Sequence, residues 1–248
     1  MKAAILAAAI TVTLATLANA QAQEVPVDLE LVLASDISAS IDEAEAALQR
    51  TGYVAALTNP KVIDTIRRGV LGRIAVTYVE WAGAQRTVVG WTVIEDQASA
   101  RAFSISLRSA SLSSGTTTSI SGALDYAAGL FDANGFEGTR QVIDISGDGR
   151  NQVGRPLGYA RADVLASGIT INALPMFRRD EDGKIINLGL DTYYTQHVIG
   201  GPGSFIVPVL DVAAFPEAIL KKLIIEIAGL DVPTTHDKMA DRAGSARQ

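Results

Sequence analysis

Short apolar runs alternate with amphipathic segments along the chain, which is the pattern of an α/β protein. Residues 27–34 have the length and composition of a buried strand, and a polar segment follows them. Apolar residues at helical spacing then predict a helix over residues 42–57, with Asp42 as its N-cap. The β-branched and aromatic segments 73–81 and 86–94 flank a short connection and predict a hairpin.

The same alternation continues to residue 229. Further helices are predicted over residues 61–68, 96–109, 120–133, 156–166 and 214–228. Further strands are predicted over residues 139–146 and 169–176, with 205–210 as the candidate for a last strand. We expect a loop at 109–121 and a polar turn at 178–189. The chain is therefore predicted to form a doubly wound α/β fold: a mostly parallel sheet with one antiparallel edge strand and helices on both faces.

The N-terminal residues have the pattern of a secretory signal peptide. Lys2 precedes an apolar run over residues 5–17, and Ala18-Asn19-Ala20 is a small-x-small cleavage site. We expect cleavage after Ala20, with Ala22 as the alternative. The apolar run is shorter than the roughly 20 residues needed to span a bilayer. These features predict a periplasmic or secreted chain with no membrane span in its mature part, one domain over residues 25–229, and a mobile tail at 230–248.

Composition narrows the classes of function. The 248 residues are 48% hydrophobic and 19% charged, and the formal net charge of −6 argues against a nucleic-acid partner. The absence of cysteine excludes a disulfide scaffold, a thiolate nucleophile and a Cys-ligated zinc site. The two histidines, His197 and His236, lack the close spacing of a zinc site.

Oxygen-bearing side chains gather in three loops beside the C-terminal ends of predicted strands. The first loop contains Asp36, Ser38 and Ser40, the second is the threonine run before the helix at residue 120, and the third contains Asp148. In an open α/β sheet the ligand crevice lies beyond these strand ends. Carboxylate and hydroxyl oxygens suit Mg²⁺ or Mn²⁺. The sequence therefore predicts a site for one of these ions.

A metal site of this kind could bind another protein. The two aspartates carry its charge, and the remaining ligands are neutral hydroxyls and water. Mg²⁺ keeps waters where the protein offers no ligand. An Asp or Glu of a protein partner could displace such a water, so we expect a metal-bridged docking site.

The three loops together resemble those of a von Willebrand factor A domain with its metal-ion-dependent adhesion site. The resemblance rests on the D-x-S-x-S pattern at Asp36, the threonine loop before Gly122-Ala123-Leu124, and the strand that ends in Gly147-Asp148-Gly149. It covers residues 27–229 and is greatest with secreted bacterial members whose function is not established. It implies five metal ligands: Asp36, Ser38, Ser40, Thr118 and Asp148. Thr116 and Thr117 are alternatives to Thr118.

Two positions depart from the family's pattern. Ala39 stands where the family usually has glycine, which requires that this residue keep a negative φ. Ser146-Gly147 precedes Asp148, where a threonine is more common. Neither change removes a ligand.

The same residues allow two alternatives to a binding module. A Mg²⁺-dependent hydrolase would need a general base, for which Glu80 and Asp144 are the candidates, although Asp144 reads better as a structural acid. A purely structural domain with a degenerate metal site is the second alternative. The chain lacks the G-x-S-x-G, Walker A, H-E-x-x-H and G-x-G-x-x-G motifs of common enzyme classes. We therefore expect a protein-binding module and no enzymatic activity.

Overall fold

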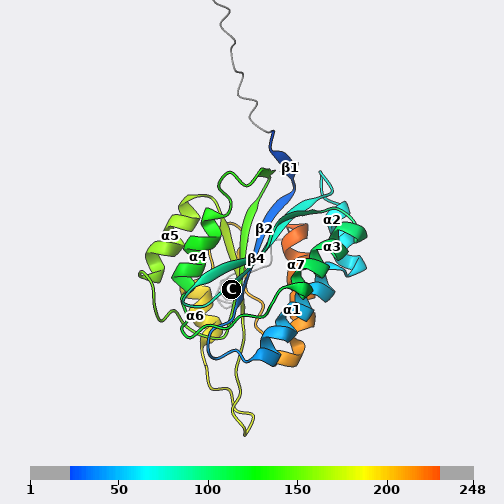
Figure 1. Ribbon diagram of the computed structural model, residues 1–248. Helices are drawn as coiled ribbons and strands as arrows, with labels where there is room; N and C mark the ends of the chain where they lie inside the picture. Colours follow the sequence, from blue (N-terminus) through cyan, green and yellow to red (C-terminus); the bar gives the residue numbers. More distant parts are fainter. Residues whose placement is uncertain (1–22, 230–248) are drawn as a thin grey trace, which may run out of the picture.

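A five-stranded sheet in the order β4-β3-β2-β6-β7 forms the centre of the structure, a computed structural model that describes residues 23–229 (Figure 1). The strands are β2 Leu29–Asp36, β3 Ile74–Trp81, β4 Gln85–Ile94, β6 Gln141–Gly147 and β7 Thr170–Pro175. Neighbouring strands are parallel except for β3 and β4, which form the predicted hairpin at one edge. The predicted doubly wound fold is confirmed.

Helices cover both faces of the sheet (Figure 1). One layer contains α1 Glu43–Leu57, α2 Pro60–Arg67, α3 Gln97–Ser109 and α7 Phe215–Ala228. The other contains α4 Ile120–Gly129, α5 Leu157–Ala166 and α6 Leu190–His197. Each layer packs its own cluster of apolar side chains against the sheet. Within residues 23–229, no helix combines the length and apolarity needed to cross a membrane.

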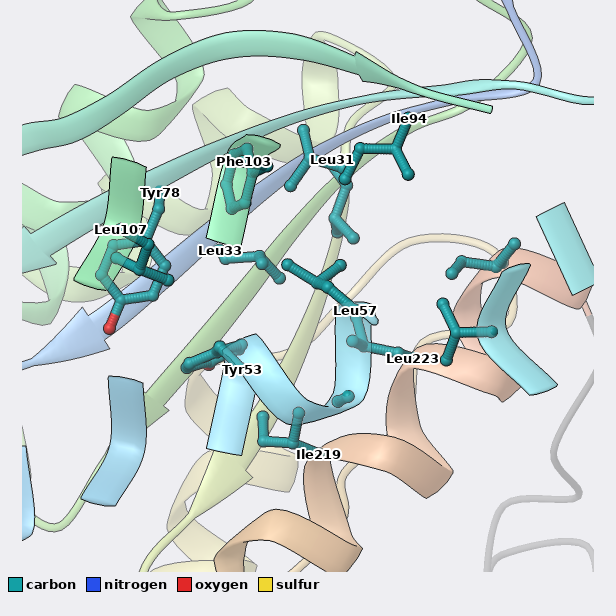
Figure 2. Close-up of a cluster of buried hydrophobic side chains, with 14 of the residues drawn as sticks. Leu31, Leu33, Tyr53, Leu57, Tyr78, Ile94, Phe103, Leu107, Ile219 and Leu223 are labelled. Carbon is teal, nitrogen blue, oxygen red and sulfur yellow. The ribbon is translucent and has the colours of Figure 1, made fainter. Parts of the chain in front are cut away.

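Strand β2 is buried along its whole length because it carries apolar residues on both faces. Leu31 and Leu33 belong to the cluster under α1 and α7, whereas the alternate residues Val32 and Ala34 belong to the opposite cluster. Figure 2 shows the first cluster, to which Leu33 of β2 and Tyr53 of α1 both belong. This two-sided packing fixes the position at which β2 ends.

The ends of β2 and β6 form the switch point of the sheet. From β2 the chain crosses to β3 on one side, and from β6 it crosses to β7 on the other. Ser35 pairs with Ser146, so the two strands end next to each other. A crevice forms where neighbouring connections diverge in this way. Asp36 ends β2 and Asp148 directly follows β6, so both stand at this switch point.

Three parts of the fold differ from the sequence prediction. Helix α6 was missed because it is short and mostly polar, with only Leu190 and Tyr194 buried. A small sheet of β1 Val25–Val27 and β5 Phe136–Gly138 was also missed. The strand predicted at 205–210 is wrong: it forms only isolated bridges, and Pro208 within it lacks an N–H for a ladder.

The helix predicted over residues 120–133 ends at Gly129. The predicted signal peptide at 1–20 and tail at 230–248 lie outside the described residues.

A buried charged cluster connects α7 to the sheet. The Lys222 ammonium lies 2.6 Å from the Asp144 carboxyl of β6 and also donates to Glu226, one helical turn away. Asn172 of β7 donates to the same Glu226 oxygen at 2.9 Å. Burial, with repulsion from Glu226, raises the pKa of Asp144 from 3.8 to about 8 despite the opposing effect of Lys222. The Lys222 ammonium is therefore shared by two buried carboxyls, those of Asp144 and Glu226, and Asp144 retains a proton at neutral pH.

This raised pKa makes stability depend on pH. Between pH 4 and pH 8 the folded chain holds a proton on Asp144 that the unfolded chain releases, so the free energy of unfolding falls as the pH rises. We predict that Asp144→Asn, which mimics the protonated acid, removes this part of the fall. The free energies of unfolding of the wild type and of the variant, measured with urea in EDTA, should diverge by on the order of a few kcal/mol between pH 5 and pH 8.5. Parallel pH curves would contradict the assignment.

Candidate metal centre

The first loop presents Asp36 from the end of β2. Its carboxylate is fully buried, and the Ser38 main-chain N–H donates to Oδ1 at 2.7 Å. On the strand side, the Ile37 N–H donates to the Trp81 carbonyl at 2.9 Å, which extends the pairing with β3. On the helix side, Asp42 caps α1. Because the loop is fixed at both ends, the direction of the Asp36 carboxylate is fixed too.

The two serines of the first loop face the same way. Ser38 Oγ and Ser40 Oγ lie 3.4 Å apart, and Ser40 Oγ donates to Asp148 Oδ1 at 2.6 Å. This contact joins the first loop to the third. The residue between them, Ala39, is not among the non-glycine residues with positive φ, so its β-carbon is accommodated.

The second loop places Thr118 against the third. Thr118 is buried, and its Oγ1 lies 3.4 Å from the point where a β-carbon on Gly149 would stand. Its carbonyl accepts from the Gln152 N–H at 2.8 Å. Thr116 is exposed, and the Thr117 hydroxyl is turned toward Gly83 in the β3–β4 connection. The geometry favours Thr118 among the three threonines, and its role as a ligand stays a prediction.

Asp148 in the third loop is held by two residues that the sequence did not reveal. The Asn187 side-chain amide donates to the Asp148 carbonyl at 2.8 Å and to the Met176 carbonyl at 2.9 Å. Arg178 Nε lies 3.5 Å from Asp148 Oδ2. Both residues belong to the turn predicted at 178–189, whose polar composition gave no sign that it folds against the third loop.

The two aspartates have little compensating charge, because Arg178, 3.5 Å from Asp148 Oδ2, is the only cationic side chain among the described residues that pairs with either of them. Asp36 Oδ2 and Asp148 Oδ2 are buried and accept no hydrogen bond from the described residues. Burial, followed by repulsion from Asp148, raises the pKa of Asp36 from 3.8 to about 7. Burial also raises the pKa of Asp148. A cation between the two would reverse both effects, because it stabilises the ionised forms.

The donor set fits a hard divalent cation. Within residues 23–229, no group of three or more His, Asp or Glu side chains is arranged to hold a metal. A site at this position would therefore combine the two carboxylates with the hydroxyls of Ser38, Ser40 and Thr118. Oxygen ligands of this kind suit Mg²⁺, Mn²⁺ and Ca²⁺ better than soft metals.

Close packing beneath the aspartates requires glycine at position 147. A β-carbon there would lie 2.5 Å from the Tyr194 hydroxyl, 3.0 Å from Asp36 Oδ2 and 3.0 Å from the Trp81 ring. Tyr194 comes from α6, so the helix that the sequence analysis missed forms part of the floor of the site. The Tyr194 hydroxyl also donates to the Gly149 carbonyl at 3.3 Å.

We predict that Gly147→Ala displaces Asp36 and Tyr194, because the added β-carbon would press against their side chains while the buried Trp81 ring beside them cannot move easily. The free energy of unfolding should fall by about 1–3 kcal/mol, as for other overpacked sites, and Mn²⁺ affinity should fall with it. Gly158→Ala in α5 is the control, because a β-carbon there meets no atom within 4 Å. Urea unfolding and Mn²⁺ titration measure both effects. Equal behaviour of the two variants would contradict the described packing.

A family model with the description "Protein of unknown function (DUF1194)" matches residues 26–231. The chain belongs to this family. A comparison of the DUF1194 chain with curated proteins finds no match.

Solved structures show that the DUF1194 chain has a von Willebrand factor A-like fold. Proximal thread matrix protein 1 from the mussel byssus, in a structure described as having a zinc-occupied MIDAS motif, superposes with a TM-score of 0.61 at 14% identity over 84% of this chain and 50% of that one. The von Willebrand factor type A protein from Catenulispora acidiphila gives 0.58 at 15% identity over 81% and 43%. BatB from Bacteroides thetaiotaomicron gives 0.54 at 22% identity over 82% and 100%. The chain thus spans about half the length of the mussel protein.

Proposed function

We propose that this DUF1194 chain is a protein-binding module that engages an acidic residue of its partner through a bound Mg²⁺ or Mn²⁺ ion. The observation that carries the proposal is the pair of buried carboxylates, Asp36 and Asp148, each with one oxygen that accepts no hydrogen bond from a described residue. Elsewhere in the described chain, the buried acid Glu80 is paired with both Arg50 and Arg86. A bound cation would provide the same compensation here.

The ion would be held by five residues: Asp36, Ser38, Ser40, Thr118 and Asp148. A divalent ion supplies Lewis acidity, which is an attraction for one more oxygen ligand. The strength of this attraction depends on the five protein ligands. The two aspartates bring negative charge, and the three hydroxyls bring none. A partner carboxylate is therefore a stronger competitor for the remaining position than water.

Proteins of the same fold support this use of the site. The mussel matrix protein is described with a zinc-occupied MIDAS motif. A pilus adhesin, SpaC from Lactobacillus rhamnosus GG, superposes with a TM-score of 0.57 at 14% identity. The N-terminal sequence pattern supports a periplasmic or secreted location for the domain at 25–229.

Hydrolysis at this site is less well supported. Glu80 accepts from Arg50 at 2.8 Å through its Oε1 and pairs with Arg86 at 2.9 Å through its Oε2, so both oxygens are engaged. Asp144 is held by Lys222 within the cluster under α7. Neither acid that could have served as a general base is free to accept a proton from a metal-bound water, and we propose that the chain is not an enzyme.

We predict that recovery of a protein partner depends on the metal and on Asp36. The immobilised chain is incubated with a periplasmic fraction in Mg²⁺ and eluted with EDTA, and the eluted proteins are identified. Asp36→Ala should lose the partner. Asp125→Ala should keep it, because Asp125 lies on the surface in an ion pair with Arg155. Equal recovery from all three proteins, in EDTA as well as in Mg²⁺, would refute the proposed function.

We also predict that Thr118 and not Thr117 binds the metal. Thr118→Val, which keeps the shape and removes the hydroxyl, should weaken Mn²⁺ binding by about tenfold or more, as loss of a metal-orienting group does. Thr117→Val should bind Mn²⁺ as the wild type does. Isothermal titration calorimetry measures both. A flat wild-type trace at millimolar Mn²⁺ or Mg²⁺ would favour the structural domain with a degenerate site.

A further inference from the structure

Arg178 is fixed in place beside the third loop. Its main-chain N–H donates to Asn187 Oδ1 at 2.9 Å, and its carbonyl accepts from the Ile186 N–H at 3.0 Å. The Asn187 amide in turn donates to the Asp148 carbonyl at 2.8 Å. The Arg178 side chain therefore starts from a position that is tied to the Asp148 loop, although it belongs to the turn between β7 and α6 that extends beyond the sheet (Figure 1).

The Arg178 guanidinium has unused hydrogen-bonding capacity. Its Nε lies 3.5 Å from Asp148 Oδ2, which is an ion pair but longer than a good hydrogen bond. The side chain is 43% exposed, and no hydrogen bond joins its terminal nitrogens to another residue of the described chain. The neighbouring Arg179 differs, because its Nη1 donates to the Gly183 carbonyl at 2.7 Å. A guanidinium presents a planar fork that matches a carboxylate.

With a divalent ion bound, the charges around the site would favour the binding of an anion. Asp36 and Asp148 together bring two negative charges, which one divalent ion would neutralise. Arg178 then adds a positive charge next to Asp148. Another acid nearby, Glu45, accepts from the Asp42 N–H at 3.1 Å in the cap of α1, and its charge also acts on Asp148 and Arg178. The exposed Arg178 guanidinium can still accept the charge of a carboxylate from outside.

We propose that Arg178 is a second contact for the acidic residue of the partner: one oxygen of that carboxylate binds the metal ion and the other accepts from the Arg178 guanidinium. This inference rests on the proposed function. It adds a reason for selectivity, because an amide or hydroxyl could reach the ion but could not form the charged contact with Arg178. It also assigns the turn at 178–189 a part in partner recognition.

The test uses acetate as the simplest carboxylate and acetamide as its uncharged counterpart. Bound Mn²⁺ accelerates the relaxation of a ¹³C nucleus that approaches it, so titration of Mn²⁺-loaded protein with ¹³C-labelled acetate gives an affinity even when binding is weak. Mn²⁺ affinity is measured separately by calorimetry. Arg178→Met removes the charge and keeps the length, Arg178→Lys keeps the charge without the fork, and Arg179→Met is the matched control.

We expect Arg178→Met to lower acetate affinity by about tenfold or more, the usual range for loss of a charge-assisted hydrogen bond. Its Mn²⁺ affinity should be unchanged or higher, because a positive charge near the ion is gone. Arg178→Lys should be intermediate, Arg179→Met should match the wild type, and acetamide should show no dependence on Arg178.

Three results would overturn the inference. If Arg178→Met binds both Mn²⁺ and acetate as the wild type does, Arg178 has no part in recognition and the proposed function still stands. If Arg178→Met loses Mn²⁺, Arg178 maintains the metal centre and does not contact the partner. If the wild type itself binds no Mn²⁺, the proposed function fails and the inference fails with it.

Discussion

The proposed site depends on the burial of two carboxylates, Asp36 and Asp148, at the neighbouring ends of β2 and β6. Each keeps one oxygen that accepts no hydrogen bond from a described residue, and burial and mutual repulsion work against the ionisation of Asp36. The buried carboxylate of Glu80, by contrast, is paired with both Arg50 and Arg86. This contrast is the reason why we propose a cation bound from solution.

The fold produces this arrangement in simple steps. Parallel pairing of β2 with β6 makes their carboxyl ends coincide, and Asp36 and Asp148 stand directly at or after those ends. The tight fit of Gly147 against Tyr194 and the Trp81 ring closes the site from below. Asp36, Ser38, Thr118 and Asp148 are buried, whereas Ala39 is exposed and Ser40 is half-buried, so the first loop brings the site to the surface.

The sequence predicts the strands and loops that carry this site, but not the residues that pack around it. The strand ends and the three loops beside them could be predicted because apolar runs, caps and the D-x-S-x-S spacing are local signals that begin and end at definite residues. Arg178, Asn187 and Tyr194 could not, because each acts through a contact with a loop some 30 to 50 positions away in the chain. Arg178 and Asn187 lie in a polar turn, and Tyr194 lies in a short helix with weak apolar periodicity. The choice of Thr118 among three adjacent threonines depended on the family register, which the placement of Thr118 beside Gly149 now supports.

The most direct test is to locate the ion. A crystal of the chain grown with Mn²⁺ should show an anomalous peak between the Asp36 and Asp148 carboxylates, with the hydroxyls of Ser38, Ser40 and Thr118 around it. A well-ordered crystal with the fold intact, millimolar Mn²⁺ present and no peak at that position would contradict the account.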